Sequence, residues 1–376
     1  MNLLSNILLN DLRDKKVLLR AGLNTPLDAS GAIVDNFRIF AAIPTLEYLI
    51  SNTKQVVIIA HLGRGREDTL RPVFLELQKH FPSLYFTQMR DLKEAMLEHN
   101  LILVENIRQD PREVSSDEQS RSSLAKELAI IMGKDSIFVQ DAFSVCHRTH
   151  ASIISLPKFM PSYAGLLVEE EVKYLRQAMD PPKPSLFVLG GAKFATKEPL
   201  IRKFLKIYDR VFIGGAIANE FFKSKGYEVG KSLVHNGSIP HDILYSKQII
   251  LPDTVRVADA DGHTIYISPD GVTSDMRIVD AVPPSNLLQD INSDIDVRYI
   301  LWNGPLGYYE GGFSQGTDRL LDMFANSDAQ ILTGGGDTMA TVGAGKHNIF
   351  SHISSGGGAM LAFLQDGDLV GLKALA

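Results

Sequence analysis

The sequence of 376 residues has one cysteine, Cys146. A single cysteine excludes an intramolecular disulfide and any zinc site built from thiolates. Apolar runs long enough to span a bilayer are also missing. The start, MNLLSNILLNDLRDKK, has acidic residues soon after a short apolar run and no small-residue cleavage site, so it makes a poor signal peptide. We expect a cytoplasmic protein with no membrane partner.

An excess of basic charge is missing as well. The chain has 38 Lys and Arg against 44 Asp and Glu, a net charge of −6 and a pI near 5.9. This balance argues against a nucleic-acid partner, which a basic surface would favour. A chain of this length is longer than a single domain built around one hydrophobic core usually is, so two domains are expected.

Two familiar nucleotide-binding motifs are absent. The stretch GAGKH places Lys346 after Gly345, but it lacks a glycine five residues earlier and a Ser or Thr after the lysine. The stretch GGGDTM has Met339 where the dinucleotide fingerprint needs Gly or Ala. The standard P-loop and dinucleotide folds are therefore disfavoured.

Short β-rich runs alternate with segments of helical period, which is typical of βα units and parallel sheets. Residues 165–179 have helical spacing and lead into DPPKP, whose prolines end a helix. We predict an α/β protein with two doubly wound parallel-sheet domains joined by a hinge helix. The expected strands are KVLLRAG, QVVIIAH, LYFT, LILVEN and SIFVQDAF in the first half, and SLFVLGG, RVFIGG, TVRVAD, RYILWNG, AQILTGGG and NIFSHIS in the second.

Small-residue turns follow five apolar runs of the second half. A single such turn is consistent with a tight βα connection. Five of them on one sheet edge predict a surface of exposed backbone amides, which suits a polyphosphate. The turns are GGAK (190–193), GGA (214–216), NGPLG (303–307), GGGDT (334–338) and SSGGGA (354–359).

Basic residues follow the apolar runs of the first half. Any one arginine is consistent with a surface residue or an ion-pair partner, but the set suits a small anion of several charges. Its members are Arg20, Asn24, Arg38, His61, Arg64, Arg108, His147, Arg148 and His150. A metal site at the three histidines is disfavoured, because no carboxylate-bearing metal motif surrounds them. For Cys146 a packed thiol is favoured over a nucleophile, since adjacent residues of an extended segment face opposite ways.

One half thus suits a nucleotide's phosphates and the other a small phosphorylated acid, which describes a two-domain kinase that closes to exclude water. Ten segments in order make the chain resemble the phosphoglycerate kinase family over nearly its full length. They are VLLRAGLNTPLD, DNFRIFAAIPTLEYL, AHLGRGRE, LVENIR, DAFSVCHRTHAS, LGGAKFATK, IGGAIANEF, LWNGPLGYYEGGFSQGT, GGGDT and FSHISSGGGAMLAFL.

The resemblance implies reversible transfer of a phosphoryl group between ATP, with Mg²⁺, and the carboxylate of 3-phosphoglycerate, giving 1,3-bisphosphoglycerate in glycolysis. It implies a monomer. It also implies an acceptor domain at 1–164, the hinge helix at 165–180, a nucleotide domain at 181–362 and a tail at 363–376 returning toward the first domain.

Site residues follow from the resemblance position by position. The acceptor would bind at Asn24, Arg38, His61, Arg64, Arg108 and Arg148. Arg38, Lys193 and Gly336 would act on the phosphoryl group in flight, and Asp337 would hold Mg²⁺. ATP or ADP would bind at Gly191, Ala192, Lys193, Lys197, Gly214, Gly215, Asn303, Pro305, Glu310, Gly335, Gly336, Asp337 and Thr338, with Lys197 near the α-phosphate and Thr338 near the β-phosphate.

The chain departs from the family pattern at Gly22, Thr196, Gln109, Ser355 and Val370. Gly22 replaces an aspartate that in the family contacts the acceptor's hydroxyl, and losing such a contact weakens discrimination as well as affinity. An alternative is that Gly22 serves a backbone with φ > 0.

Three hypotheses remain open at this point. The first is a phosphoglycerate kinase with a weakened or altered acceptor site. The second is a carboxylate kinase whose acceptor lacks the hydroxyl, and the third is a non-catalytic nucleotide-binding paralogue. The third hypothesis is disfavoured, because the chain retains all four of Arg38, Lys193, Lys197 and Asp337.

Overall fold

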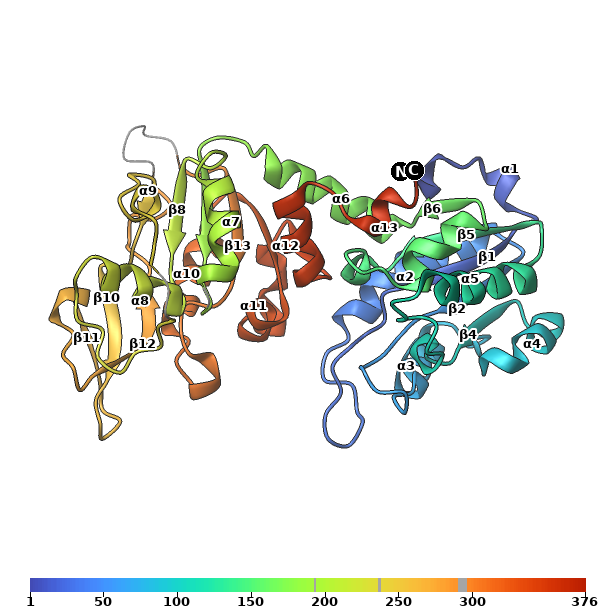
Figure 1. The fold of residues 1–376 in the computed structure, drawn as a ribbon, viewed down its shortest axis with the longest axis horizontal. Helices are drawn as coiled ribbons and strands as arrows, with labels where there is room; N and C mark the ends of the chain where they lie inside the picture. Colours follow the sequence, from blue (N-terminus) through green and yellow to red (C-terminus); the bar gives the residue numbers. More distant parts are fainter. Residues whose placement is uncertain (193, 236–237, 290–295) are drawn as a thin grey trace. The chain divides into compact units, whose positions relative to one another are not determined.

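The computed structural model describes residues 1–192, 194–235, 238–289 and 296–376. The chain divides into two compact units (Figure 1). Unit 1 comprises Met1–Lys173 and Asp366–Ala376, and unit 2 comprises Tyr174–Gln365. The division falls inside helix α6, Leu166–Met179, within the segment for which a helix was predicted.

Unit 1 is built on six parallel strands in the order β3-β4-β2-β1-β5-β6. The strands are β1 Lys16–Ala21, β2 Gln55–Ile59, β3 Tyr85–Thr87, β4 Leu101–Val104, β5 Ser136–Asp141 and β6 Ser162–Ala164. The helices are α1 Leu9–Leu12, α2 Phe37–Asn52, α3 Arg71–His80, α4 Leu92–Glu98, α5 Glu118–Met132 and α13 Val370–Lys373. Shorter turns of helix are η1 Leu4–Asn6, η2 Met89–Asp91, η3 Ile107–Gln109, η4 Phe143–Val145, η5 Ala151–Ser155 and η6 Leu156–Lys158.

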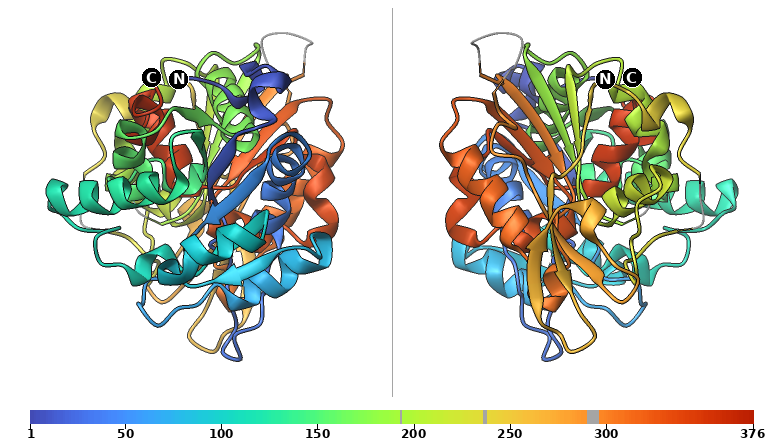
Figure 2. Two further views of the ribbon diagram at one scale, coloured as in Figure 1. Left: turned by 90° about the vertical axis from the view of Figure 1, so that its right-hand side faces the viewer. Right: turned by 90° about the vertical axis from the view of Figure 1, so that its left-hand side faces the viewer.

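Helices cover both faces of this sheet, and Figure 2 shows them on either side of the strands. Val17 and Leu19 of β1 pack with Ile39 and Leu46 of α2, whereas Leu18 lies in a second core with α5. Because both faces are buried, the strands read as continuous Val, Ile and Leu runs rather than as alternating ones.

The end of the chain packs within unit 1. The backbone N–H of Asn2 donates to the carbonyl of Leu375 at 2.8 Å, and that of Gly371 donates to the carbonyl of Cys146 at 2.8 Å. Cys146 itself is fully buried, and burial raises the pKa of its thiol. The packed thiol predicted from the sequence is therefore confirmed.

Unit 2 has a second sheet of six parallel strands, in the order β15-β14-β13-β7-β8-β9. The strands are β7 Ser185–Leu189, β8 Arg210–Ile213, β9 Ile249–Ile250, β13 Tyr299–Asn303, β14 Gln330–Gly334 and β15 His352–Ser354. The helices are α7 Phe194–Phe204, α8 Gly215–Ser224, α9 His241–Leu244, α10 Gln315–Ala325, α11 Gly336–Thr341 and α12 Gly357–Asp366. Shorter turns are η7 Pro269–Gly271, η8 Tyr309–Gly311 and η9 Ala344–Ile349. The fold class predicted from the sequence is confirmed.

One expected strand belongs elsewhere. TVRVAD forms β10, Thr254–Ala258, but β10 lies in a separate antiparallel sheet between β11, Thr264–Ile267, and β12, Arg277–Val282. Its assignment to a parallel βα unit was wrong. The chain turns back after β10 through Asp261 and Gly262, where Gly262 has φ +84°, so a hairpin replaces the crossover helix that parallel strands need.

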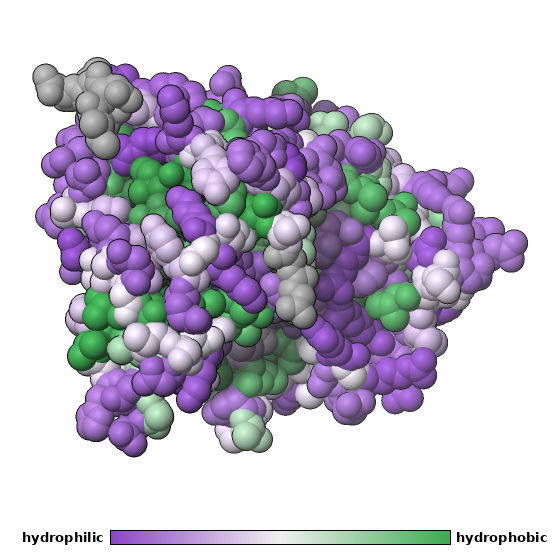
Figure 3. Space-filling view, turned by 60° about the vertical axis from the view of Figure 1, so that its left-hand side comes forward, coloured by the Kyte–Doolittle hydropathy of each residue, from purple (hydrophilic) through white to green (hydrophobic). Residues whose placement is uncertain are grey.

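The surface carries polar and apolar residues intermixed, as Figure 3 shows for one face. No helix in the described ranges is long and apolar enough to cross a membrane.

Candidate active site

In unit 1, the predicted acceptor-site residues follow strands that are neighbours in the sheet. The strands β4, β2, β1 and β5 stand side by side, so the loops at their carboxyl ends meet along one edge. We call these loops the basic edge. Its predicted members are Asn24 after β1, Arg38 in the first turn of α2, His61 and Arg64 after β2, Arg108 after β4 and Arg148 after β5.

Hydrogen bonds join three of these loops. The Asn24 side-chain oxygen accepts from the backbone N–H of Gly63 at 2.8 Å. The Arg38 guanidinium donates to the carbonyl of Asn24, and the Arg108 guanidinium donates to the carbonyl of Gly63. The loops after β1, β2 and β4 are therefore held to one another through their backbones.

Like charges accumulate at the basic edge. Burial, and then the charges of Arg20 and Arg108, hold the pKa of His61 well below its usual range. Burial and Arg108 lower the pKa of His150 to about 3. The pKa of Arg108 is itself lowered, first by burial and next by Arg148. Both imidazoles are neutral at pH 7, and the arginines form a positive cluster that an anion would stabilise.

Gly22 lies buried at the same edge, directly after β1. It is not among the glycines with positive φ. A Cβ added there would have Ala142 Cα as its nearest neighbour, at 3.4 Å, which is ordinary contact. The alternative that this position needs φ > 0 is therefore wrong, because the backbone accepts a side chain here.

In unit 2, the five predicted turns follow β7, β8, β13, β14 and β15, all parallel strands of one sheet. The strand ends are in register, with Asn303 opposite Leu189 and Gly334 opposite Ser354. The turns therefore share one edge, as predicted. We call them the glycine edge, comprising residues 190–192, 214–216, 304–307, 335–338 and 355–359.

Because many residues of these turns are glycines without a side chain, the backbones of neighbouring turns lie in contact. A Cβ on Gly190 would lie 2.2 Å from the carbonyl oxygen of Pro305, and one on Gly357 would lie 2.4 Å from Gly335 Cα. By contrast, a Cβ on Gly336 would meet nothing within 4 Å, and Gly336 is exposed. Most of the glycines thus serve close packing between turns, while Gly336 offers its backbone to the outside.

Three polar side chains connect the turns from within. Lys197 Nζ donates to Asn303 Oδ1 at 2.8 Å, and Asn303 Nδ2 donates to the carbonyl of Gly334 at 2.8 Å. The hydroxyl of Thr338 accepts from the backbone N–H of Gly304 at 2.8 Å. Thr338 is buried, so its hydroxyl already has a partner inside the protein.

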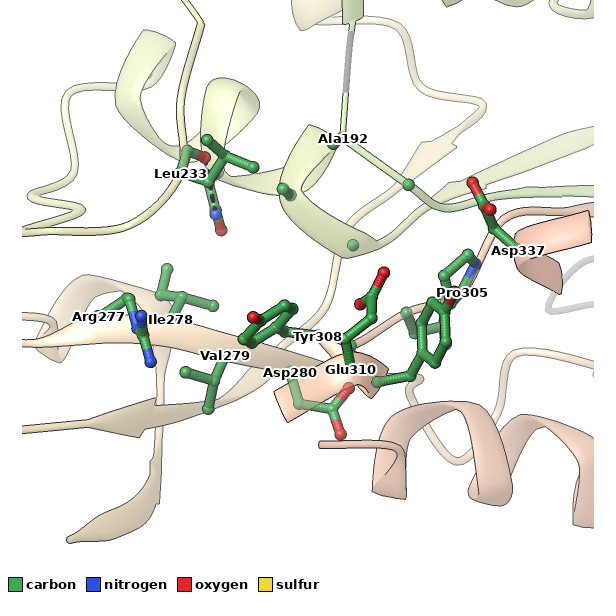
Figure 4. A pocket seen from close by; sticks show the side chains of 17 residues that line it. Ala192, Leu233, Arg277, Ile278, Val279, Asp280, Pro305, Tyr308, Glu310 and Asp337 are labelled. Carbon is green, nitrogen blue, oxygen red and sulfur yellow. Dashed lines mark hydrogen bonds between the residues drawn. The ribbon is translucent and has the colours of Figure 1, made fainter. Parts of the chain in front are cut away.

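A pocket of about 430 Å³ opens along the glycine edge (Figure 4). Its lining includes the predicted residues Gly191, Ala192, Gly215, Pro305, Glu310 and Asp337. The same turns and strand ends contain the further predicted residues Gly214, Asn303, Gly335, Gly336 and Thr338. Lys193, which was also predicted, lies outside the described residues.

The two ends of the pocket differ in chemistry. Figure 4 shows Leu233 and Ile278 toward one end, Asp337 toward the other and Glu310 between them. The exposed Asp337 carboxylate partly offsets the lowering of the Lys197 pKa by burial, which shows that the two charges interact. The pocket therefore combines apolar side chains at one end with a carboxylate at the other.

The apolar end was not predicted from the sequence. Its apolar side chains are Leu233 and, from β12, Ile278 and Val279, and the side chains of Arg277 and Tyr308 also line it. These residue types carry no motif and read as ordinary strand and loop positions. The Asp-Gly turn at 261–262 could have indicated the antiparallel sheet that brings β12 to the pocket.

Comparisons with known proteins agree with this architecture. The family model described as Phosphoglycerate kinase matches residues 7–367. A phosphoglycerate kinase of Coprothermobacter proteolyticus is 34% identical over 388 residues, covering 97% of each chain. One of Mycobacterium sp. (strain KMS) is 36% identical over 399 residues, covering 98% of each.

Two solved structures are similar over the whole chain. The phosphoglycerate kinase of Coxiella burnetii has a TM-score of 0.81 at 32% identity, covering 99% of this chain and 98% of its own. That of Pyrococcus horikoshii OT3 has a TM-score of 0.83 at 27% identity, covering 100% of this chain and 98% of its own.

Proposed function

Because the chain belongs to the phosphoglycerate kinase family, we propose that it transfers a phosphoryl group reversibly between MgATP and the carboxylate of 3-phosphoglycerate. The product is 1,3-bisphosphoglycerate, and the reaction belongs to glycolysis in the cytoplasm. The observation that carries this proposal is the family match over residues 7–367. The enzyme works as a monomer.

The basic edge binds the phosphorylated acid. Arg64, Arg108 and Arg148 neutralise its phosphate, the neutral His61 donates a hydrogen bond to it, and Arg38 holds the reacting carboxylate. The like-charge cluster around Arg108 supports this assignment, since it stores repulsion that a multiply charged anion relieves. Asn24 contributes its side-chain amide N–H₂, because its oxygen accepts from Gly63.

The glycine edge binds the nucleotide. The base lies at the apolar end beside Leu233 and Ile278, and the phosphates lie at the end marked by Asp337, next to Gly336 at the start of α11. Lys197 neutralises the α-phosphate. The remaining contacts come from Gly191, Ala192, Lys193, Gly214, Gly215, Asn303, Pro305, Glu310, Gly335 and Thr338, of which Lys193 is outside the described residues.

The donor set at the polar end fits Mg²⁺. Asp337 supplies one exposed carboxylate there, and Mg²⁺ is commonly bound through one or two carboxylates together with substrate phosphates and waters. When bound, the ion neutralises charge on the phosphate oxygens. Asp337 would hold it.

The chain's own residues contribute alignment and charge. Phosphoryl transfer asks for little covalent chemistry, so a site of guanidinium, ammonium and amide donors is sufficient and no protein nucleophile is needed. Arg38 stabilises charge on the phosphoryl group in flight, and a donor in that role is worth roughly 10²- to 10⁵-fold in rate.

A coupled assay tests the proposal. MgATP is supplied with 3-phosphoglycerate, or with each of a panel of small carboxylic acids that lack the hydroxyl. We expect turnover with 3-phosphoglycerate to exceed that with every other acid. Preference for an acid without the hydroxyl would replace this function by the second hypothesis, for which Gly22 is the motivating residue. Absence of turnover with every acid would leave only the non-catalytic paralogue, which the relatives do not favour.

A further inference from the structure

A fully buried chain of polar groups lies beneath the basic edge. It connects Glu113, Ser152, Arg20 and His61, which come from four separate segments of unit 1. Glu113 Oε1 accepts from Ser152 Oγ at 2.6 Å, and Ser152 Oγ accepts from Arg20 Nε at 2.9 Å. Arg20 Nη2 lies 2.9 Å from His61 Nδ1.

These contacts fix the guanidinium of Arg20. Its third nitrogen, Nη1, donates to the carbonyl of Ala21 at 2.8 Å, so all three nitrogens have partners. The side chain is fully buried. Burial lowers its pKa to about 10, so Arg20 keeps its charge at pH 7.

The contact with Arg20 determines where His61 carries its proton. A guanidinium has donors and no acceptor, so Nδ1 of His61 must accept. A neutral imidazole that accepts at Nδ1 has its proton on Nε2. Among the described residues no hydrogen bond to Nε2 is present, and Nε2 is not one of the buried polar atoms that lack a partner, so Nε2–H reaches the surface of unit 1 and can donate to an external oxygen.

Glu113 provides the negative charge that balances Arg20. Its Oε1 lies 4.0 Å from Arg20 Nη2, and its Oε2 accepts from the backbone N–H of Ser152 at 2.9 Å. Both carboxylate oxygens therefore face donors. A glutamine would turn an amide N–H₂ toward one of those donors and would leave the buried guanidinium without a counter-charge.

We propose that Glu113 is a positioning residue, which acts through Ser152 and Arg20 to hold His61 as the Nε2–H tautomer that donates to the acceptor's oxygen. This inference rests on the proposed function in one respect, the assignment of His61 to the acceptor. Glu113 itself is fully buried, so it acts through the chain of hydrogen bonds and not on the substrate.

Nitrogen NMR of the free protein tests the tautomer directly. Protein labelled with ¹⁵N-histidine gives separate signals for protonated and unprotonated ring nitrogens, and the loss of one set in His61→Gln assigns His61 among the 10 histidines. We expect wild-type His61 to carry its proton on Nε2 alone. In Glu113→Gln the two tautomers should mix, and the KM for 3-phosphoglycerate should rise about tenfold, with kcat and the KM for ATP within about twofold.

Two further variants make the result decisive. Ser152→Ala removes the link between Glu113 and Arg20 Nε and should shift the tautomer in the same direction, so it decides the question should Glu113→Gln not fold. Glu105→Gln is the matched control, because Glu105 is also a buried carboxylate of unit 1, bonded to Thr69, Leu70 and Asn106. It should lose stability and keep the wild-type His61 signals.

The outcomes separate this inference from the proposed function. A single Nε2–H tautomer in folded Glu113→Gln and in Ser152→Ala would overturn the positioning role, and so would equal mixing in Glu105→Gln. A shifted tautomer in a protein without activity on 3-phosphoglycerate would keep the positioning of His61 and overturn the proposed function alone.

Discussion

The basic edge of unit 1 and the glycine edge of unit 2 occupy the same position in two similar folds, beyond the carboxyl ends of parallel strands. They differ in what the loops present. The basic edge presents long charged side chains such as Arg108, whose pKa is lowered by burial and by a neighbouring arginine. The glycine edge presents backbone, with Gly336 open to the outside.

The difference follows from the shapes of the two ligands that we propose. A small acid with several charges can be surrounded by guanidinium groups that reach in from separate strands. A nucleotide is longer, and its phosphates lie near the main chain only where side chains are missing. The same architecture therefore supplies two kinds of anion site, one made by adding side chains and the other by removing them.

Arg38→Ala should have the largest effect. We expect kcat to fall roughly 10²- to 10⁵-fold, with the affinity for ADP nearly unchanged, because Arg38 belongs to the basic edge. Steady-state kinetics and calorimetric titration with ADP provide the two measurements. A kcat within about tenfold of wild type, a change of about 1.4 kcal/mol in the barrier, would show that the proposed role is wrong.

A pair of variants tests whether the two edges act on different substrates. Asp337→Ala should impair the use of MgATP, since it removes the carboxylate proposed to hold Mg²⁺. Arg64→Ala should raise chiefly the KM for 3-phosphoglycerate, by roughly tenfold for a lost charged hydrogen bond. Measuring both KM values for both variants decides the matter, and equal effects on both substrates would contradict the division.

Replacing one glycine of each edge by alanine should change the stability of the protein by different amounts. Gly215 has φ +60°, and a Cβ there would lie 2.6 Å from the backbone nitrogen of Gly191. Gly215→Ala should therefore lower the melting temperature, since strained backbone alone costs roughly 1–3 kcal/mol. Gly22→Ala is the matched control and should melt within a few degrees of wild type. Similar losses in both variants would remove this contrast between the edges.

The sequence indicated most strands of both parallel sheets and the position of both edges, but it missed the short strands β6 and β9 and placed β10 in the wrong kind of sheet. Buried Val and Ile runs indicated the strands, and a residue that follows a parallel strand must lie at the carboxyl edge. It was not sufficient for the apolar end of the pocket, because Leu233 and Ile278 carry no chemistry that marks a site. The buried link from Glu113 to Arg20 was also missed, since it joins residues 93 positions apart and depends on side-chain geometry.

Gly22→Asp tests the residue that most separates this chain from its family. The structure allows the change at Cβ, with ordinary contact to Ala142 and no positive φ. A restored carboxylate can accept a hydrogen bond from the hydroxyl of 3-phosphoglycerate, which is worth roughly 1.5–3 kcal/mol. We therefore expect the KM for 3-phosphoglycerate to fall by about tenfold.

Two measurements make this last test specific. Gly22→Ala supplies the Cβ without the carboxylate and should leave the KM for 3-phosphoglycerate unchanged, so any gain in Gly22→Asp comes from the charge. An analogue without the hydroxyl should bind Gly22→Asp no better than it binds wild type. If Gly22→Asp melts like Gly22→Ala and gains nothing for 3-phosphoglycerate, then 3-phosphoglycerate is not the acceptor that this site is built for. Gly22 then belongs to a site for a different acceptor acid, and the panel of carboxylic acids should identify one that the wild-type protein prefers.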